Sequence, residues 1–399
     1  MKEVVIAEYL RTAQSRSRPY KPEGDWFHKV RSDELLARLL PEVLKRAGVD
    51  SESVDDFIVG CACGIGEQFT MGGKTPLYLA NLSKDISTKF VDMQCGSAMA
   101  ALQIGFMEIA TGSTDIVLVG GMEHQTRQND YEDIKNGTIK MHPALFSDEA
   151  YRHWDIEFSN NMGLTAEKLF DQTNITREEM DKFAHRSHVL AAKSTEEGWF
   201  NGEILPIDAE QADGSVMTVD RDQSIRGETT LEGLADLKPC FKADGVITAG
   251  ISSPLNAGAS AMLLMSKESA LEIGLEPMAT IRAIGLAGVD PTIMGAGPVP
   301  ATRKALKNAG LDVSDVDYWE INEAFSIVAL NCIKELGIDP DRVNVKGGAM
   351  ALGHPLGATG IRLVGTLARI LKDKNARYGC ANACVGGGSG IATIIEKNV

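Results

Sequence analysis

The chain contains 399 residues, and its 40 Lys or Arg against 55 Asp or Glu give a formal net charge of −15. With 44% hydrophobic residues, the composition is that of a folded protein of two or three domains, which excludes an intrinsically disordered chain or a fibrous repeat. The acidic balance argues against a nucleic-acid binder, and no apolar run approaches the ~20 residues that span a membrane.

The first third of the chain alternates short β-rich runs with helical patterns, which is typical of an α/β fold. The chain enters a strand-like segment almost directly after Met1. Further strands are predicted over 55–58, 89–93 and 116–119. Between the last two, small and apolar residues at helical spacing predict a helix over 97–110.

The middle of the chain, from about 123 to 248, is polar and rich in loop-forming residues. One helix is predicted inside it, from Thr176 as N-cap, with two glutamates in its first turn, to about Ser194. We interpret this stretch as an inserted subdomain.

After Ser253 the α/β alternation returns. The predicted elements are strands over 259–265, 318–321 and 390–396 and helices over 301–309, closed by Gly310, and 359–371. Cys95 and Cys384 each follow a strand-like run, one in each half of the chain, and this favours a duplicated fold.

The cysteines predict a reducing compartment. Their number, seven, is odd and they are scattered along the chain, which does not fit a disulfide framework. The N-terminal segment also lacks the apolar core of a signal peptide. We therefore expect free thiols and a cytoplasmic location.

Two of the cysteines lie in clusters where chemistry is expected. Cys95 stands where a strand should turn into a helix, and a helix N-terminus stabilises a thiolate. The alternative is a buried Cys acting as a small hydrophobic residue. Cys384 is followed by the glycine run 386–388, which suits a thiol acid or base beside exposed backbone N–H groups. Here the alternative is a glycine turn with an incidental Cys.

Two further clusters hold candidates for proton transfer and hydrogen bonding. Pro355 restricts the backbone of His354, and the surrounding glycines permit close approach of a substrate, so the imidazole could exchange a proton with a nucleophile or an oxyanion. The alternative is a loop histidine in solvent. Asn322, at the end of a predicted strand, could orient a water; the alternative is an ordinary turn cap.

These four clusters, in this order, resemble the thiolase family of acyl-CoA acyltransferases, and the resemblance covers essentially the whole chain. It continues through the motifs Gly121-Met122-Glu123-His124, 162–167, 237–239, 248–250 and 297–300. It implies a thiolase fold, with two similar layered α-β-α-β-α halves and an inserted loop domain. The implied domains are an N-terminal thiolase domain over 1–121 continued by 250–272, a loop domain over 122–249, and a C-terminal thiolase domain over 273–399.

The resemblance also implies the catalytic residues. Cys95 matches the nucleophile that holds the acyl group as a thioester, and His354 matches the residue that activates this thiol and then donates to the thioester or enolate oxygen. Cys384 matches the thiol that protonates the departing acetyl-CoA carbanion and deprotonates incoming CoA. Asn322 matches the residue that fixes a water in the oxyanion hole of His354. The backbone N–H groups of Cys95 and Gly386 match a second oxyanion hole.

For CoA binding, the resemblance points to the loop domain and its edges. The residues implied are Met162, Arg226, Phe241, Ala249, Ser253 and Phe325. Arg226 is the expected partner of a phosphate on an otherwise acidic protein, and the alternative is a solvated surface arginine. CoA is a substrate here, and no metal or redox cofactor is implied. The implied partners are acyl-CoA and CoA, further copies in a homodimer or homotetramer, and other enzymes of β-oxidation.

A degradative 3-ketoacyl-CoA thiolase is the expected activity. The stretches 162–167, 174–188 and 290–304 resemble the fatty-acid-degrading branch, and Asn161 stands where short-chain biosynthetic thiolases commonly carry His. Ala98 argues the other way, since its methyl could shorten the acyl pocket. Two alternatives stay open: a short-chain acetoacetyl-CoA thiolase, and a non-catalytic acyl-CoA or lipid binder with a thiolase fold. The presence of both cysteines and the histidine argues against the binder.

Overall fold

A mixed sheet of ten strands runs through the computed structural model, which describes residues 1–128, 130–137 and 140–398. The strand order is β10-β11-β12-β9-β1-β8-β5-β3-β4, and β2 also pairs with β8. The strands are β1 Val4–Arg11, β2 Ser15–Arg16, β3 Asp56–Gly60, β4 Ser87–Val91, β5 Ile116–His124, β8 Asn256–Ser266, β9 Ala279–Gly288, β10 Tyr318–Ile321, β11 Tyr378–Val385 and β12 Ser389–Glu396. Positions 129, 138 and 139 of the expected loop domain, and 399, lie outside the described residues.

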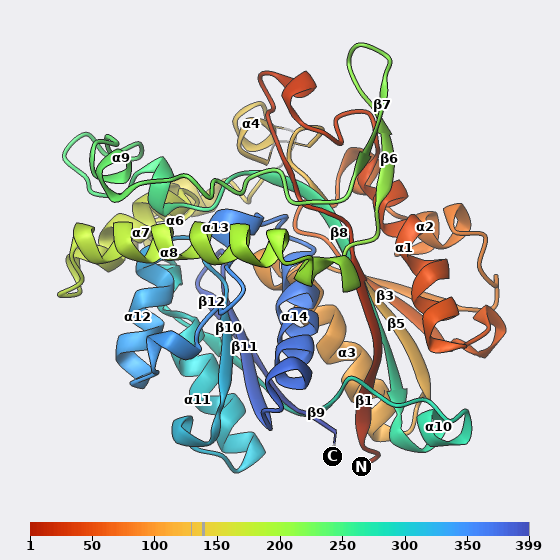
Figure 1. Ribbon diagram of the computed structural model, residues 1–399. Coiled ribbons are helices and arrows are strands. Elements are labelled where there is room, and N and C mark those ends of the chain that lie inside the picture. Colours follow the sequence, from red (N-terminus) through yellow and green to blue (C-terminus); the bar gives the residue numbers. More distant parts are fainter. Residues whose placement is uncertain (129, 138–139, 399) are drawn as a thin grey trace.

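Helices cover both faces of this sheet. The main ones are α1 Ser32–Ala47, α3 Ser97–Thr111, α11 Pro298–Ala309, α12 Ser326–Leu336 and α14 Thr359–Lys374. Apolar side chains of α3 and α14 pack against strands of both halves in one core, whereas α1 and the α11–α12 pair build separate cores on the opposite face. The layers therefore follow the order α-β-α-β-α, with α3 and α14 at the centre (Figure 1). The predicted layered α/β fold is confirmed.

The first strand joins the two halves of the sheet. On one side β1 pairs antiparallel with β8 along its whole length, and on the other Val4 to Ile6 pair antiparallel with Ala279 to Ile281 of β9. Parallel pairs occur only towards the two ends of the described sheet, between β3 and its neighbours β4 and β5 and between β10 and β11. The N-terminal strand thus lies at the middle of the sheet.

Most elements predicted outside the middle region are confirmed to within a few residues. The helix expected over 97–110 is α3, and the strand expected over 318–321 is β10. The helix expected over 301–309 begins earlier, at Pro298, and ends as predicted before Gly310, which has a left-handed backbone with φ 69°. Glycine adopts this conformation without strain, which explains why the helix stops there.

The region between β5 and β8 contains more regular structure than predicted. Its elements are α4 Asp130–Lys135, α5 Ala144–Ser147, α6 Ile156–Ser159, α7 Met162–Asp171, α8 Arg177–Glu196, α9 Leu231–Ala235 and the hairpin β6 Ile207–Glu210 with β7 Val216–Val219. The other helices and the hairpin were not predicted, and most of these helices are too short to leave a periodic pattern. The predicted helix itself is confirmed as α8, capped by Thr176, and Figure 1 shows it crossing above α12 and α14.

Three short helices complete the fold: α2 Lys74–Leu79, α10 Lys267–Glu272 and α13 Ala349–Leu352. Within the described ranges, none of the helices has both the length and the apolar character that crossing a bilayer requires. In the same ranges, no three His, Cys, Asp or Glu side chains gather as they would around a metal ion. All seven cysteines are free, and only Cys240 is exposed.

Candidate active site

Cys95 lies in the turn that leads from β4 into the N-terminus of α3. A single 3-10 turn, Gln94–Gly96, carries the residue, and α3 begins immediately after it at Ser97. The predicted placement at a strand-to-helix turn is therefore confirmed. The side chain is largely buried, with 8% of the residue exposed. The partial positive charge at the N-terminus of α3 favours the thiolate form of a thiol at this position.

Cys384 lies on β11, close to the turn into β12, and is fully buried. Burial raises the pKa of its thiol above the ordinary value, and the nearby Cys95 adds to the rise. The turn of Cys95 packs directly on the end of this strand, because a side chain at Gly96 would meet Val385 Cγ2 at 2.8 Å. The fold thus brings together the two cysteines singled out in the sequence, and it keeps Cys384 protonated.

The glycine run after β11 lies against the same turn. A Cβ atom at Gly386 would meet Gln94 Cγ and Met162 Sδ, each at 3.6 Å. Gly388 has a φ of 86°, and a Cβ there would approach the Val289 carbonyl oxygen to 2.5 Å. Only glycine fits this second position, so the run can hold its backbone close to the cysteine pair.

Hydrogen bonds determine which nitrogen of His354 carries the proton. The Nδ1 atom lies 2.7 Å from Thr359 Oγ1, whose own proton goes to the carbonyl of Pro355 at 2.9 Å. Thr359 therefore accepts from Nδ1–H. This leaves a lone pair on Nε2, which faces the side-chain amide nitrogen of Asn322 at 3.3 Å. The basic nitrogen of the imidazole is Nε2.

His354 is also held in its neutral form. It is 3% exposed, and burial, with a smaller contribution from the positive charge of Arg362, lowers the pKa of His354 to about 3. A neutral imidazole accepts a proton from a thiol, and the buried imidazolium that results is a strong acid that returns it. The alternative of a solvent-exposed loop histidine is therefore wrong.

Asn322 connects His354 to the end of β11. It follows β10 directly, and its backbone N–H donates to the carbonyl of Asn382 at 2.9 Å. Cys384 stands two residues beyond Asn382 on the same strand. The side-chain Oδ1 of Asn322 is buried without a partner among the described residues. A buried acceptor of this kind needs a water or a substrate donor, as the prediction of a water-fixing role requires.

The structure adds two residues that the sequence did not assign to the site. Asn256, at the start of β8, accepts the backbone N–H of His354 through Oδ1 at 2.8 Å. Glu123, at the end of β5, is buried and accepts the backbone N–H of Gly357 at 3.0 Å. The loop that carries His354 is thereby fixed at two points. Glu123 lies in one of the motifs of the family resemblance, but no local signal marks Asn256.

Glu323 is a third unassigned residue, next to Asn322. It is fully buried, and burial raises the pKa of its carboxyl. Its oxygens accept from Ser187 Oγ and Asn344 Nδ2, both at 2.7 Å, and from the backbone N–H of Met350 at 3.1 Å. This side chain links α8 and α13 to the segment that follows β10 and carries Asn322.

Most of the residues predicted to bind CoA gather beside the cysteine pair. The rings of Phe241 and Phe325 stand edge to face at 6.0 Å, and Phe241 covers the first turn of α7, because a Cβ at Gly163 would meet its ring at 2.1 Å. Met162 begins the same turn. Ser253 donates its backbone N–H to the carbonyl before Phe325 at 2.9 Å.

Two of the predicted CoA residues lie further along these segments. Ala249 opens the short turn Ala249–Ile251, which leads towards Ser253. Arg226 stands apart from the aromatic pair. Its backbone N–H donates to His188 Nδ1 at 3.2 Å, and its exposed guanidinium has no described partner.

Two residues that depart from the family pattern have structural roles. Ala98 is fully buried, and a Cβ at Gly121 would meet its methyl at 2.8 Å. This methyl fills core space between α3 and β5. Asn161 is the N-cap of α7, and its Oδ1 accepts the backbone N–H of Leu164 at 3.2 Å.

Comparison with known families gives two matches that cover most of the chain. Residues 4–268 match the family model described as thiolase, N-terminal domain, and residues 275–397 match thiolase, C-terminal domain. A 3-ketoacyl-CoA thiolase of Vibrio vulnificus (strain CMCP6) is 43% identical over 402 residues, covering 100% of both chains. A protein of the same description from Marinobacter nauticus (strain ATCC 700491 / DSM 11845 / VT8) is 41% identical over 401 residues, covering 99% of this chain and 98% of its own.

Solved structures with the same fold include proteins of two descriptions. The crystal structure of human mitochondrial 3-ketoacyl-CoA thiolase superimposes with a TM-score of 0.87 and 32% identity, covering 100% of this chain and 99% of that one. The crystal structure of the Bacillus anthracis acetyl-CoA acetyltransferase gives a TM-score of 0.85 and 34% identity at the same coverage.

Proposed function

Because this chain belongs to the thiolase family of acyltransferases, we propose that it cleaves 3-ketoacyl-CoA with CoA into acyl-CoA and acetyl-CoA through a thioester on Cys95. The relatives at 41 to 43% identity are named 3-ketoacyl-CoA thiolases, which supports a role in fatty-acid degradation. The observation that carries the proposal is the neutral, buried His354, whose lone pair on Nε2 faces the side-chain amide of Asn322. Asn322 is in turn hydrogen-bonded to β11, the strand that carries Cys384.

In the first half-reaction the thiol of Cys95 gives its proton to Nε2 of His354, and the thiolate attacks C3 of the 3-ketoacyl group. Backbone N–H groups of Cys95 and Gly386 stabilise the oxyanion on C3. The C2–C3 bond then breaks, which leaves the acyl group on Cys95 and a carbanion at C2 of acetyl-CoA. His354 and a water on Asn322 stabilise its enolate oxygen, and Cys384 gives its proton to C2. The raised pKa of Cys384 supports this acid role.

In the second half-reaction the thiol of CoA gives its proton to the thiolate of Cys384. The CoA thiolate attacks the thioester carbonyl, and the tetrahedral intermediate collapses with loss of the Cys95 sulfur. That sulfur recovers its proton from the imidazolium of His354. Atoms and charges return to the starting state, and acyl-CoA leaves.

Acylation by an acyl-CoA tests the roles of the two cysteines. A Cys240→Ser background removes the exposed thiol, and peptide mapping by mass spectrometry locates the acyl group. We expect it on Cys95. In this background Cys95→Ala should form no acyl-enzyme, and Cys384→Ser should be acylated yet turn over very slowly. Label on a different peptide would contradict the assignment, and CoA binding without any acylation would favour the non-catalytic binder.

A chain-length series tests the substrate class. The stretches 162–167, 174–188 and 290–304 support acyl chains longer than acetoacetyl, and we expect kcat/KM to be higher for six-carbon and longer 3-ketoacyl-CoAs than for acetoacetyl-CoA. The second candidate is a short-chain acetoacetyl-CoA thiolase, which the likeness to the acetyl-CoA acetyltransferase supports. Activity confined to acetoacetyl-CoA would establish this candidate and leave the roles of Cys95 and Cys384 unchanged.

We further propose that the protein acts in the cytoplasm as a homodimer or homotetramer, alongside other enzymes of β-oxidation. Four apolar side chains near the edge strand β4 are more than half exposed, which supports a face for a second copy. They are Phe69, Met71, Tyr78 and Leu79. Light scattering should give a multiple of 42.9 kDa for the wild type and a smaller species for the Met71→Glu/Leu79→Glu variant.

A further inference from the structure

Three arginines, Arg16, Arg18 and Arg226, differ from all the others in the chain. Every other arginine donates to a carboxylate or a backbone carbonyl, or lies over an aromatic ring. Among the described residues, no side chain or backbone carbonyl accepts a hydrogen bond from the guanidinium group of these three arginines. Arg18 and Arg226 are exposed and Arg16 is half-buried, so exposure alone does not set them apart. What does is the absence of a described carboxylate partner for all three in a protein whose net charge is −15.

The fold brings Arg16 and Arg226 together by laying two distant segments side by side. Gln223 donates its backbone N–H to the carbonyl of Gln14 at 3.0 Å, and its side-chain Oε1 accepts the backbone N–H of Arg16 at 2.7 Å. Ser224 follows Gln223 in the direction of Arg226. The side-chain amide of Asn256 donates both to Ser224 Oγ and to the carbonyl of Ser15, next to Arg16. The two arginines therefore project from neighbouring backbone positions.

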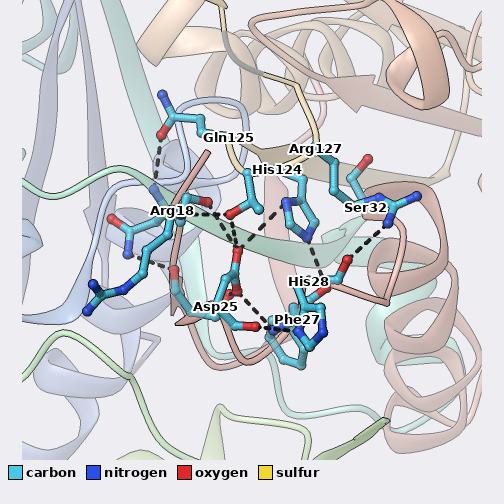
Figure 2. Close-up of polar contacts among 12 residues, drawn as sticks. Arg18, Asp25, Phe27, His28, Ser32, His124, Gln125 and Arg127 are labelled. Carbon is cyan, nitrogen blue, oxygen red and sulfur yellow. Dashed lines mark hydrogen bonds and ion pairs between the residues drawn. The ribbon is translucent and has the colours of Figure 1, made fainter. Parts of the chain in front are cut away.

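Arg18 is held next to them by a buried network. Its backbone N–H donates to Thr126 Oγ1 at 2.8 Å, and Thr126 donates in turn to the buried Asp25. Asp25 also accepts the backbone N–H of Phe27 at 2.9 Å. Figure 2 shows the side chain of Arg18 extending away from these hydrogen bonds, on the opposite side from Arg127. The network fixes the backbone and leaves the guanidinium free.

The backbone segments of this cationic cluster are linked to the loop of His354 through one side chain, that of Asn256. The side-chain Nδ2 of Asn256 donates to the carbonyl of Ser15 at 2.9 Å and to Ser224 Oγ at 3.4 Å. The Oδ1 of the same side chain accepts the backbone N–H of His354 at 2.8 Å. One amide thus joins both arginine-bearing segments to the loop of His354.

The cluster is electrostatically unfavourable without a ligand. Arg16 is half-buried, and burial, followed by the positive charges of Arg226 and Arg18, lowers the pKa of its guanidinium. Like charges held together and partly out of water lower stability unless an anion lies between them. Local conflicts of this kind occur where a protein gives up stability for function.

We propose that Arg16, Arg18 and Arg226 together form a subsite for the phosphoryl groups at the nucleotide end of CoA. This inference rests on the proposed function, in which CoA is a substrate, and adds Arg16 and Arg18 to Arg226, which the family resemblance already implied. Planar guanidinium groups bind phosphate oxygens through paired hydrogen bonds, and two or three of them suit a diphosphate or a diphosphate with a ribose phosphate. They also supply the local positive charge that an anionic substrate needs on an acidic protein.

The test varies the acceptor thiol. In a ping-pong reaction, kcat/KM for the acceptor reports only the second half-reaction, so the donor 3-ketoacyl-CoA does not affect the comparison. CoA, dephospho-CoA and pantetheine share the reacting thiol and differ in their phosphates. We expect Arg16→Gln to lower the ratio of kcat/KM for CoA to that for pantetheine by about tenfold or more, as charged hydrogen bonds predict. Arg303→Gln, on the exposed face of α11 beside Glu335, is the matched control and should leave the ratio unchanged.

The dephospho-CoA arm separates the two sources of phosphate. If Arg16→Gln lowers kcat/KM relative to pantetheine for dephospho-CoA as well as for CoA, the result supports binding of the diphosphate. If kcat/KM falls only for CoA, the result supports binding of the 3′-phosphate. A ratio that stays at the wild-type value, or an equal fall for CoA and pantetheine, would overturn the subsite. Arg226→Gln, at an exposed position, serves as a second variant, and melting temperatures check that both are folded.

Binding at equilibrium keeps this inference separate from the proposed function. If the wild type shows no thiolysis with any acceptor, the proposed function fails. Calorimetric titration with CoA and with pantetheine then tests the subsite alone. Binding of CoA about tenfold weaker to Arg16→Gln than to Arg303→Gln supports it, and equal binding overturns it.

Discussion

A single threonine determines the chemistry available to His354. Thr359 has one hydroxyl proton, and because the Pro355 carbonyl takes it, the hydroxyl oxygen can only accept from the imidazole. Burial decides the charge of the ring, and the threonine decides the tautomer. Thr359 is therefore a positioning residue that acts through His354.

Replacing this hydroxyl with a methyl group should impair proton transfer while the packing around His354 is kept. Thr359→Val has nearly the same shape but cannot accept from Nδ1–H, so Nε2 will hold the proton in part of the molecules. We expect kcat/KM to fall by about 100-fold, the lower range of what a general base contributes. The alkylation rate of Cys95 should fall in parallel at neutral pH.

Thr359→Ser is the matched control, since it keeps the oxygen. It should retain most of the activity and of the alkylation rate. If the serine and valine variants lose activity equally, the hydroxyl does not set the tautomer, and the threonine methyl matters through packing alone.

Ala98 gives a second prediction at this scale, on substrate length. Its methyl packs against Gly121 in the core, so Ala98→Gly should lower the free energy of unfolding by roughly 1 kcal/mol, about the value of one buried methyl group. The ratio of kcat/KM between acetoacetyl-CoA and an eight-carbon 3-ketoacyl-CoA should stay within about twofold of the wild type. A marked shift towards the longer substrate would show that the methyl does reach the acyl pocket.

Residue types and their glycine-rich surroundings were enough to predict the candidate catalytic groups. Cys95 and His354 each stand out locally, one at a strand-to-helix turn and the other before a proline. Their supporting residues could not be predicted in the same way. Asn256 and His354 are 98 positions apart, and only the packing of β8 against the histidine loop makes them neighbours. The tautomer depends on the position of a hydroxyl, which no pattern encodes.

Among the helices and strands, α8 shows how the middle region supports the site from outside. It begins with a complete capping box, in which Thr176 Oγ1 accepts from the Glu179 backbone and the Glu179 carboxylate accepts from the Thr176 backbone. Eleven residues after Thr176, Ser187 donates to the buried Glu323 beside Asn322. A helix that is stable at its start therefore holds a hydrogen bond to the residue next to Asn322, one of the candidate catalytic residues.

The capping box can be tested by its effect on stability. Thr176→Ala removes the acceptor for the Glu179 N–H and should lower the free energy of unfolding by about 1 kcal/mol. The melting temperature should fall, and kcat/KM should remain near the wild-type value because the cap is exposed and far along α8 from Ser187. Thr176→Ser should melt like the wild type. A large loss of activity at unchanged stability would contradict this account.

Elements with strong patterns were predicted well, and short ones were not. The helix α3 and the strand β10 follow from apolar spacing alone, and Gly310 marks the end of α11. In the middle region, helices such as α5 and α6 have four residues each, about one turn. Such pieces depend on tertiary contacts, and their sequences resemble loops.

For the molecule as a whole, two buried histidines limit stability in acid. Burial lowers the pKa of His354 to about 3, and burial, followed by the charges of Arg226 and His185, lowers the pKa of His188 to about 4. Both groups are neutral when folded but take up a proton near pH 6.5 when the chain unfolds. The unfolded state then binds more protons, so stability decreases as pH falls from about 6.5 towards 4.

His188→Gln should weaken this pH dependence. The variant takes up one proton fewer on unfolding. The slope of the free energy of unfolding against pH therefore decreases by up to about 1.4 kcal/mol per pH unit between pH 4 and 6.5. Melting temperatures measured over this range should therefore fall less steeply for the variant. His142→Gln, at an exposed position, is the control and should follow the wild type. Parallel curves for wild type and His188→Gln would show that this histidine does not take part.

The central place of β1 in the sheet has a consequence for biosynthesis. Val4 leaves the ribosome long before its two partners, Ser266 of β8 and Ile281 of β9, are translated. At 5–20 residues per second the nascent chain waits roughly 15 to 60 s before both neighbours exist. During that time β1 has two unpaired edges, which are open to wrong pairing. A truncated chain that ends before β8 would stay in this state, so the N-terminal half cannot complete its sheet alone.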